Sequence, residues 1–415
     1  MPTATTFSSY KQFLGVASEA TLGQGTPVAM TATIPVEKID FEDKPVWLSD
    51  KALRGSMVDE YQKIQGVIKT DFSFSGPVFG DTLGWLLGNI LGDVLYGGGT
   101  NVGSSTTTAT TMVAGVTTTF TVASGTGITI GTVLAIGTGG TLENVTCITG
   151  TTGTTVVINR PVVFAHSGTT TVQPVSAAFT SAFSTLNSGQ GQPTSHTFTQ
   201  FQGTPASTGA RQYPGSCLSE LTLKWNAETA LLTYDAKGSS WPSVIAGASP
   251  TAAPSTVVPV ASWRGLLGLA GPASGGTQDK TVTDGEVTIK RMIEPVFTTQ
   301  NSQNPYIIQR GAVSVNGKMN FIAANEAPYL HMLNNDQPQL QLIIGNGLAG
   351  ANLVQVQLDT QQTAFTSAKY NAGKAAVAYD VAFDAVANTT NAGVSGGYSP
   401  IKATLTNAIA AQTYV

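Results

Sequence analysis

Charged residues are scarce in this 415-residue sequence, at 11% of the total, where soluble domains usually carry about 25%. Lys and Arg number 20 against 24 Asp and Glu, which leaves a net charge of −4. A protein that binds nucleic acid by neutralising phosphates needs a basic surplus, so the composition excludes that class. It also excludes a disordered chain, because 41% of the residues are hydrophobic and charge is sparse.

Long hydrophobic runs are missing as well. The most apolar stretch, Val78–Leu95, is interrupted by Asp81, Asn89 and Asp93, so it does not reach the roughly eighteen apolar residues of a membrane-spanning helix. The N-terminal Met1–Tyr10 lacks the basic and apolar regions of a signal peptide. We therefore expect neither a membrane span nor a cleaved secretion signal.

Cysteine and histidine are too few for a disulfide framework or a zinc site. The two cysteines, Cys147 and Cys217, lie in strand-like segments, where we expect them to be small buried hydrophobic residues. The three histidines, His166, His196 and His331, are far apart and none has a metal-binding spacing such as HExxH. We interpret each histidine as a packed or surface residue and predict no metal site.

Motifs for catalysis are missing too. The glycine-rich run Gly125–Gly131 lacks the GK[ST] ending of a phosphate-binding loop and precedes no helix. No GxSxG nucleophile elbow precedes a helix, and no carboxylate lies in a pattern that indicates an acid/base pair. We predict that the chain is not an enzyme and holds no cofactor.

Threonine and glycine are plentiful, with 59 Thr and 46 Gly. Thr and Val favour strands and Gly favours turns, so this composition predicts an all-β protein. Residues 97–176 hold 24 Thr and 14 Gly but only two charges, Glu143 and Arg160. This stretch alternates short strand patterns with glycine-rich turns, and we interpret it as a small β-module inserted into a larger unit.

The first part of the chain follows a plan of strand pair, helix, strand pair. Met57–Gln62 and Val67–Gly76 predict two strands around a turn, and leucines at helical spacing predict a helix over Phe79–Leu91. After the insert, Ser219–Asn226 and Ala230–Lys237 alternate polar and apolar residues as half-buried strands do. The Pro/Ala/Ser-rich stretch 242–262 is typical of a linker.

The second part repeats this plan. Tyr306–Arg310 and Val313–Phe321 predict a strand pair, and Glu326–Asn334 predicts a short helix. Further strands are expected at Gln339–Ile344, Val354–Leu358, Lys374–Ala387 and Ile401–Thr406.

The two parts can be aligned, which indicates an internal duplication. Tyr61–Gly66 matches Tyr306–Gly311, and fifteen residues after each glycine an acid, Asp81 or Glu326, lies near the helix start. Asn89 and Asn334 then close the two helices, twenty-three residues after those glycines. Further along the chain, Gly215–Ala236 aligns with Gly373–Ala387. We thus expect one unit at 1–96 plus 177–250, the insert at 97–176, and a second unit at 251–415.

The sequence resembles the major tail proteins, the tail tube subunits of long-tailed, siphovirus-type bacteriophages. The segments that carry the resemblance are Leu14–Gly23, Gly66–Gly92, Arg211–Gly238, Gly373–Ala387 and Pro400–Asn407. The resemblance implies a β-sandwich or barrel with one helix, in subunits that form rings. The inner strands of a ring join into one barrel, and the rings stack into a tube that conducts DNA without binding it specifically. It implies no catalytic residue.

The resemblance also implies partners and a location. The chain would assemble with itself in the host cytoplasm, and with the tape measure, tail terminator and baseplate proteins, into the virion tail. Two units in one chain would fill two positions of a six-fold ring, so we expect trimeric rings with approximate six-fold symmetry. The alternative is a hexameric ring in which residues 260–410 form an outer domain.

Strand alternation supplies candidates for the channel lining. The polar faces of the paired strands carry Asp71, Glu220, Asp380 and Asp384, interspersed with Lys69, Lys224 and Lys318, and we expect these seven side chains to face the lumen. The insert is expected on the outer wall, because a projection into the lumen would block DNA. A secreted or cell-surface β-rich adhesin is the alternative function, and a β-rich glycosidase ranks third.

Overall fold

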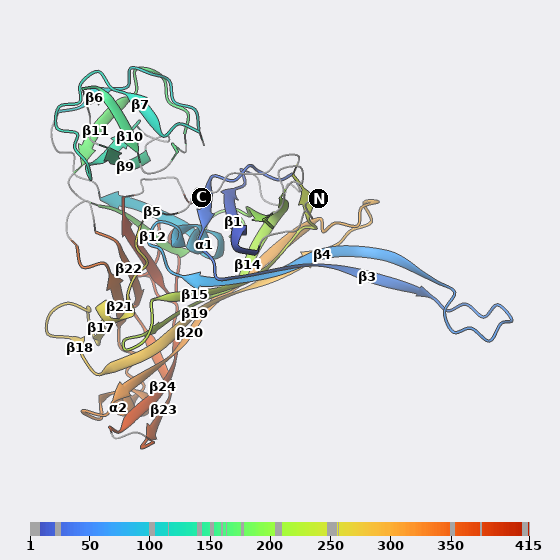
Figure 1. Cartoon of the computed structure of the whole chain (residues 1–415). Helices are drawn as coiled ribbons and strands as arrows, with labels where there is room; N and C mark the ends of the chain where they lie inside the picture. Colours follow the sequence, from blue (N-terminus) through green and yellow to red (C-terminus); the bar gives the residue numbers. More distant parts are fainter. Residues whose placement is uncertain are drawn as a thin grey trace, which may run out of the picture.

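The computed structural model confirms the predicted all-β fold with short helices (Figure 1). It describes residues 9–20, 26–98, 104–114, 116–138, 143–149, 153–158, 161–162, 164–175, 178–203, 210–246, 255, 257–348, 353–373, 376–408 and 414. Arg160, Thr21–Gly23, Lys374 and much of the expected 242–262 linker lie outside these described residues.

Eight antiparallel strands form the main sheet, and they do not close into a barrel within the described chain. Their order is β3 (Lys38–Asp50), β4 (Gln62–Pro77), β15 (Thr233–Ser240), β14 (Arg211–Asn226), β19 (Val282–Val296), β20 (Ile307–Ile322), β24 (Ala378–Ala385) and β23 (Thr363–Asn371). The first residues of β14 also pair with β16 (Val244–Ile245) and with β13 (His196–Phe201), beside which lie β1 (Phe13–Ser18) and β2 (Ala32–Ile34).

A second sheet shares one hydrophobic core with the main sheet (Figure 1). It runs in the order β18 (Gln278–Asp279), β17 (Leu266–Leu269), β21 (Leu340–Gly345), β22 (Gln355–Thr360), β25 (Lys402–Asn407), β12 (Phe179–Thr185) and β5 (Gly92–Gly98). Strands from both parts of the chain therefore share each sheet, because β25 from the second part pairs with β12 from the first.

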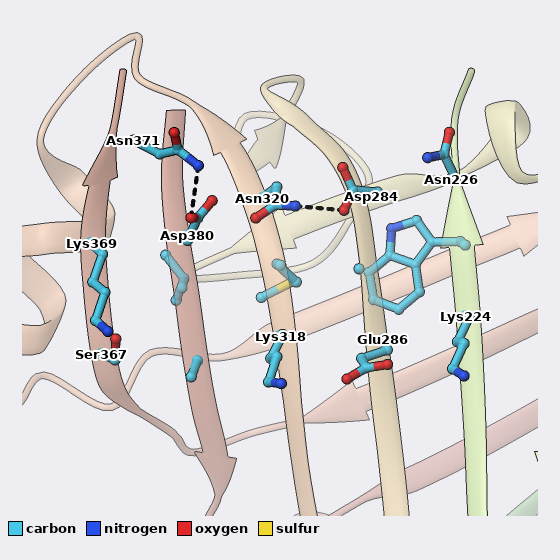
Figure 2. Close-up of a pocket in the computed structure, with 15 residues that line it drawn as sticks. Lys224, Asn226, Asp284, Glu286, Lys318, Asn320, Ser367, Lys369, Asn371 and Asp380 are labelled. Atoms are coloured by element: carbon cyan, nitrogen blue, oxygen red, sulfur yellow. Dashed lines mark hydrogen bonds between the residues drawn. The ribbon is translucent and has the colours of Figure 1, made fainter. Parts of the chain in front are cut away.

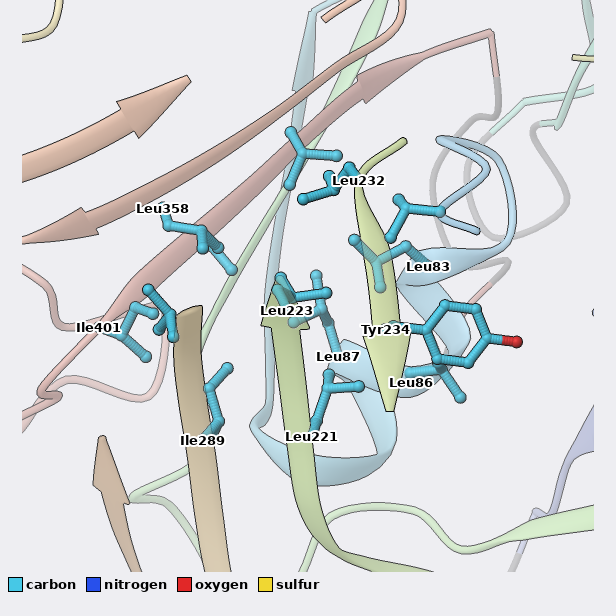
Figure 3. Close-up of a cluster of buried hydrophobic side chains, with 14 of the residues drawn as sticks. Leu83, Leu86, Leu87, Leu221, Leu223, Leu232, Tyr234, Ile289, Leu358 and Ile401 are labelled. Carbon is cyan, nitrogen blue, oxygen red and sulfur yellow. The ribbon is translucent and has the colours of Figure 1, made fainter. Parts of the chain in front are cut away.

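Because side chains alternate along each strand, every second row of cross-strand partners is apolar and points into the core between the sheets. One such row of cross-strand partners is Ile39, Phe74, Ala236, Leu221, Ile289 and Val315. Helix α1 (Leu83–Ile90) packs into the same core with all eight residues buried, and Figure 3 shows its leucines beside Leu221 and Leu223. Its Leu83, Leu86, Leu87 and Ile90 recur at helical spacing, as the sequence predicts.

The two four-stranded halves of the main sheet have the same topology. In β3–β4–β15–β14 and in β19–β20–β24–β23, the fourth strand along the chain lies between the second and the third. Two register shifts also recur. One falls between Pro45 and Trp47 in the first hairpin and between Arg291 and Ile293 in the second. The other falls between Leu218 and Glu220 in β14, and between Phe365 and Ser367 in β23.

These coincidences fix which residues correspond in the two halves. In the hairpins, β4 and β20 are each sixteen residues long, and the alignment of Gly66 with Gly311 keeps their bulges in step. The later alignment of Gly215–Ala236 with Gly373–Ala387 is wrong, because β24 takes the place of β15 and β23 takes that of β14.

The strand partners within each hairpin also differ from expectation. Residues 62–77 form one strand, so the expected turn at 63–66 is wrong, and the partner of β4 is β3. Likewise, Tyr306–Arg310 and Val313–Phe321 do not pair with each other. They fall almost entirely within the single strand β20, whose partner is β19. The turn of each hairpin lies further out than the sequence indicated.

The Thr-rich stretch forms a six-stranded sheet of its own (Figure 1). Its strands are β6 (Thr106–Thr107), β11 (Thr171–Val175), β8 (Val133–Ile136), β9 (Glu143–Thr149), β10 (Thr155–Ile158) and β7 (Thr119–Thr121). A separate apolar cluster, which includes Phe120, Leu134 and Val156, fills it. The chain leaves from β5 and returns in β12, whose Gly98 and Phe179 are cross-strand partners.

Buried polar groups tie the C-terminal end of α1 to the main sheet. The Asn89 side chain donates to the Ser216 carbonyl at 2.9 Å and accepts from the Leu218 amide at 2.8 Å. Arg310 donates to the Asn89 carbonyl at 2.7 Å, and Arg291 donates to the Ile90 carbonyl at 2.8 Å. Cations suit this end of a helix, whose last carbonyls have no partner within the helix.

We predict that Asn89→Ala destabilises the unassembled chain by about 3 kcal/mol, because the Leu218 amide and the Ser216 carbonyl lose a buried partner. Denaturant unfolding in dilute solution measures this. The matched control is Asn334→Ala at the corresponding end of α2 (Ala327–Asn334), where the asparagine is exposed. Equal losses of stability in the two variants would contradict the role of Asn89 as a buried hydrogen-bonding partner.

Candidate functional site

The face of the main sheet opposite the core is polar from one edge to the other. A row of cross-strand partners illustrates it: Lys38, Ser75, Asp235, Thr222, Thr288, Asn316 and Asp384. The registers keep residues two apart in each strand on this side. We call this surface the polar face.

All seven sequence-predicted residues lie on the polar face. Glu220 and Lys224 are in β14, where Lys224 is the partner of Glu286 and Glu286 that of Lys318 in β20. Asp380 is in β24 opposite Asn320 of β20. The other three are Lys69 and Asp71 in β4 and Asp384 in β24. Residues more than 300 apart in sequence thus share one continuous surface.

Sequence analysis missed the contributions of β3, β19 and β23. The signal in β3 is the alternation Lys38-Ile39-Asp40-Phe41-Glu42, which ends at Pro45. The signal in β19 is Glu286-Val287-Thr288-Ile289-Lys290. Both patterns are typical of half-buried strands.

Opposite charges neutralise one another across the polar face. The registers place nine acids and eight lysines on it: Asp40, Glu42, Asp71, Glu220, Asp235, Asp284, Glu286, Asp380 and Asp384, with Lys38, Lys44, Lys69, Lys224, Lys237, Lys290, Lys318 and Lys369. Lys237 lies 2.8 Å from Glu220, and Lys290 lies 3.9 Å from the other oxygen of the same carboxylate. The surface is therefore close to electrically neutral.

Amide groups add hydrogen bonds in the open trough that Figure 2 shows, where Asn320 donates to Asp284 at 2.6 Å. Outside this trough, on the same face, Thr222 and Thr288 share a hydrogen bond of 3.0 Å. At the outer strand, Asn371 donates to Asp380 at 2.9 Å. Hydrogen bonds and ion pairs thus engage several acids of the polar face, so part of its charge is balanced locally.

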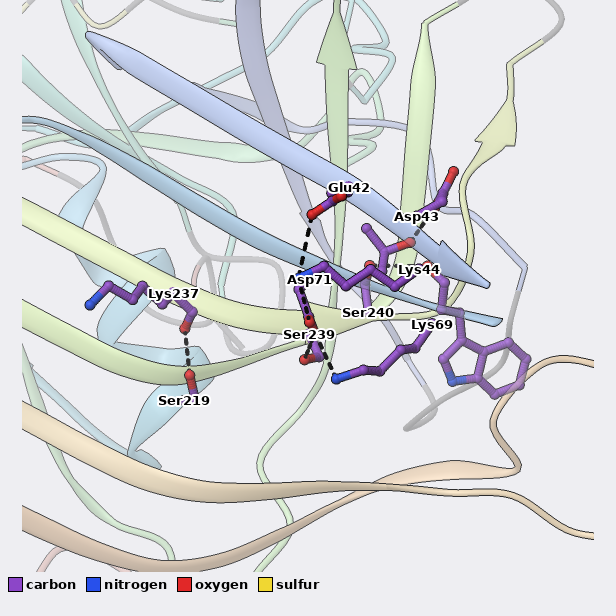
Figure 4. Close-up of polar contacts among 11 residues, drawn as sticks. Glu42, Asp43, Lys44, Lys69, Asp71, Ser219, Lys237, Ser239 and Ser240 are labelled. Atoms are coloured by element: carbon purple, nitrogen blue, oxygen red, sulfur yellow. Dashed lines mark hydrogen bonds and ion pairs between the residues drawn. The ribbon is translucent and has the colours of Figure 1, made fainter. Parts of the chain in front are cut away.

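Asp71 is the most heavily coordinated carboxylate of the polar face (Figure 4). Ser239 donates to it at 2.6 Å, Lys69 lies at 3.0 Å and Lys44 at 3.2 Å. Partial burial alone would raise the pKa of Asp71, but these hydrogen bonds outweigh it and hold the pKa below its ordinary value. The carboxylate remains charged at neutral pH.

Histidine and cysteine, side chains that often act in catalysis, are buried at His196, Cys147 and Cys217. His196 is inaccessible to solvent, and burial, with the charge of Arg310 adding to it, lowers its pKa to about 3. Burial also raises the pKa of the Cys217 thiol, and both cysteines are buried as expected. Within the described ranges, no group of three or more His, Cys, Asp or Glu side chains could hold a metal ion.

The sequence matches a known protein family. A family model described as phage tail tube protein matches residues 9–385, which is most of the chain. No curated protein matches the sequence. Among the described residues, no helix is both long and apolar enough to span a membrane.

We predict that Asp71→Asn lowers the stability of the unassembled chain at pH 7 by about 1 kcal/mol or less, because the carboxylate is partly exposed. A carboxylate with a depressed folded-state pKa stabilises the fold above its unfolded pKa of about 4, and this contribution is lost as the pH falls through the folded value. The difference between variant and wild type should thus shrink as the pH falls below the unfolded pKa, and vanish once the pH lies below the folded pKa.

Denaturant unfolding over a series of pH values from 7 downward measures this difference. Asp384→Asn is the matched control, because Asp384 lies on the same face and forms no ion pair with the described residues. A difference for Asp71→Asn that stays constant as the pH falls would show that the effect is not electrostatic.

Proposed function

Because this chain belongs to the phage tail tube protein family, a structural family of the virion tail, we propose that it polymerises into stacked rings that conduct DNA out of the virion. The observation that carries the proposal is the main sheet. One of its faces is buried in the core, the other is polar and nearly neutral, and both outermost strands, β3 and β23, keep one edge unpaired among the described residues. Such edges carry unpaired backbone donors and acceptors, which can pair with further strands.

Three chains make one ring in this proposal. Each contributes eight strands, so a ring closes as a barrel of twenty-four. At about 4.8 Å between strands, its backbone circumference is at least about 115 Å and its diameter at least about 37 Å. Side chains narrow this opening, but a DNA duplex still fits. Closure also removes the two open edges at β3 and β23.

The repeated topology supports three chains over six. Each half of the main sheet has the same strand order and the same two bulges, so each half fills one of six similar positions. We propose that the units at 1–96 plus 177–250 and at 251–415 arose by tandem duplication. The alternative hexamer needs the second unit outside the barrel, whereas β19, β20, β24 and β23 continue the sheet of the first unit.

The polar face lines the lumen in this assembly. The seven predicted residues Asp71, Lys69, Glu220, Lys224, Lys318, Asp380 and Asp384 all lie on it. DNA carries a charge at every phosphate, and a cationic wall would bind it by releasing counterions. A wall whose positive and negative charges nearly balance neither holds the DNA nor repels it strongly, as a conduit for DNA requires.

The inserted module takes the outer wall. It joins the molecule through β5 and β12 of the second sheet, and Figure 1 shows it next to β5. The second sheet shares its core with the apolar face of the main sheet, opposite the polar face. The tail ends and the lumen are where terminator, baseplate and tape measure proteins would meet the tube.

We predict three chains per ring. Cryo-electron microscopy of tubes assembled from the purified protein should give a reconstruction with true three-fold and approximate six-fold symmetry. Each ring should show three copies of the inserted module on its outside. Six chains per ring would contradict the proposal.

We also predict that tubes form without the insert. Gly98 and Phe179 are cross-strand partners, so replacing residues 99–178 by a short Gly/Asn turn should preserve the β5–β12 hairpin. Negative-stain microscopy should show tubes of unchanged inner diameter and a thinner wall. Folded chains that no longer assemble would refute the outer placement.

A further inference from the structure

We propose that β23 of one chain pairs with β3 of the next copy in the same register that joins β14 to β19 within the chain. This inference rests on the proposed function, and it names the residues at the subunit junction. The β14–β19 junction inside the chain is the template for the junction between chains.

The template joins the third strand of the first half to the first strand of the second. Its cross-strand partners on the polar face are Glu220 with Lys290, Thr222 with Thr288, and Lys224 with Glu286. On the buried face, Leu223 is the partner of Val287. In a ring, the third strand of the second half, β23, would meet the first strand of the next first half, β3.

The bulges transfer the register without any free choice. Counting from the shared bulge, Ser367, Lys369 and Asn371 occupy the positions of Glu220, Thr222 and Lys224. In the same way, Lys44, Glu42 and Asp40 occupy the positions of Lys290, Thr288 and Glu286. The predicted partners across the junction are therefore Lys369 with Glu42 of the next copy, and Asn371 with Asp40.

The chemistry of the transferred partners is complementary, although charge played no part in selecting them. Lys369 is exposed and forms no ion pair with the described residues, and Glu42 is exposed as well. A shift of two residues in one direction would oppose Lys369 to Lys44, and like charges directly opposite each other destabilise a sheet. A shift of one residue would put the polar side chains against the core face.

The buried face of the junction gains an aromatic contact. Tyr370 is 66% exposed in the chain and takes the position of Leu223. Its partner is Phe41 of the next copy, which stacks on Tyr213 with ring centroids 4.2 Å apart. The junction would thus extend an aromatic cluster from one chain into the next.

The two helices give independent support. Helix α1 contacts both β14 and β19 and is buried throughout, whereas α2 contacts β23 and β24 and buries only Pro328. Leu330 and Leu333 of α2 remain 44% and 59% exposed. The missing neighbour of α2 is the counterpart of the β19–β20 hairpin.

That counterpart is the β3–β4 hairpin of the next copy. Arg291 and Arg310 of β19–β20 cross the C-terminal end of α1, and their corresponding residues are Pro45 and Gln65. Beside them, four apolar residues are about half exposed: Val46, Trp47, Leu48 and Ile64. The exposed leucines of α2 and the exposed apolar residues of the β3–β4 hairpin would bury each other. The hairpin of the next copy therefore lies across α2.

A cysteine pair tests the register. Lys369→Cys combined with Glu42→Cys in one chain should, in oxidised tubes, give covalent dimers and closed trimers on a denaturing gel. Antiparallel partners lie within the Cα separation that a disulfide needs. The native Cys147 and Cys217 are buried, so wild-type tubes should give none.

The matched control is Lys369→Cys with Asp40→Cys, which corresponds to a register shifted by two residues. Crosslinking of this control in place of the first pair would overturn the register while leaving the tube intact. Tubes that form without crosslinking either pair would overturn the β23–β3 junction. A wild-type protein that forms no rings or tubes would instead refute the proposed function.

Charge exchange gives a second readout. Lys369→Glu would face Glu42 of the next copy and should raise the critical concentration for assembly at least about tenfold. Adding Glu42→Lys should restore assembly, and Lys280→Glu, an exposed lysine outside both edge strands, should have no effect. A double variant as defective as Lys369→Glu alone would contradict the pairing.

Discussion

The unpaired edges of the main sheet are the constraint on which the rest of the structure depends. A strand edge presents a row of backbone donors and acceptors that pair with any strand of suitable shape. In the described chain, β3 and β23 each leave one such edge open, at opposite ends of eight hydrogen-bonded strands. In the proposed ring, further copies of the chain would pair with both of these edges.

The core and the polar face follow from the same sheet. The second sheet and α1 cover one side of it, so that the apolar residue of each alternating pair is buried. The other side can then carry polar residues along its whole width without loss of stability. Strand alternation therefore separates the residues that stabilise the sheet from those of the polar face. In the proposed tube, a substitution on the polar face would change the lumen more than the fold.

The sequence allowed parts of this account to be predicted and not others. Period-two alternation in Ser219–Asn226 gave the correct face for Glu220 and Lys224, and the leucine spacing gave α1. Alternation does not say which strand lies beside which. The pattern alone therefore matches Gly373–Ala387 to the segment that contains β14, whereas its strand β24 takes the place of β15. β3 was missed because Pro45 and a bulge interrupt its pattern. Register depends on hydrogen bonds between strands that are distant in the chain.

Hydrogen–deuterium exchange of the unassembled chain and of assembled tubes tests most directly whether the sheet closes through its edges. Peptides that cover Lys38–Lys44 and Ser367–Asn371 should exchange quickly in the unassembled chain and slowly in tubes. Interior segments such as Leu221–Lys224, which are paired on both sides, should be protected in both states. Edge amides that exchange equally fast in tubes and in the free chain would contradict a closed barrel of strands.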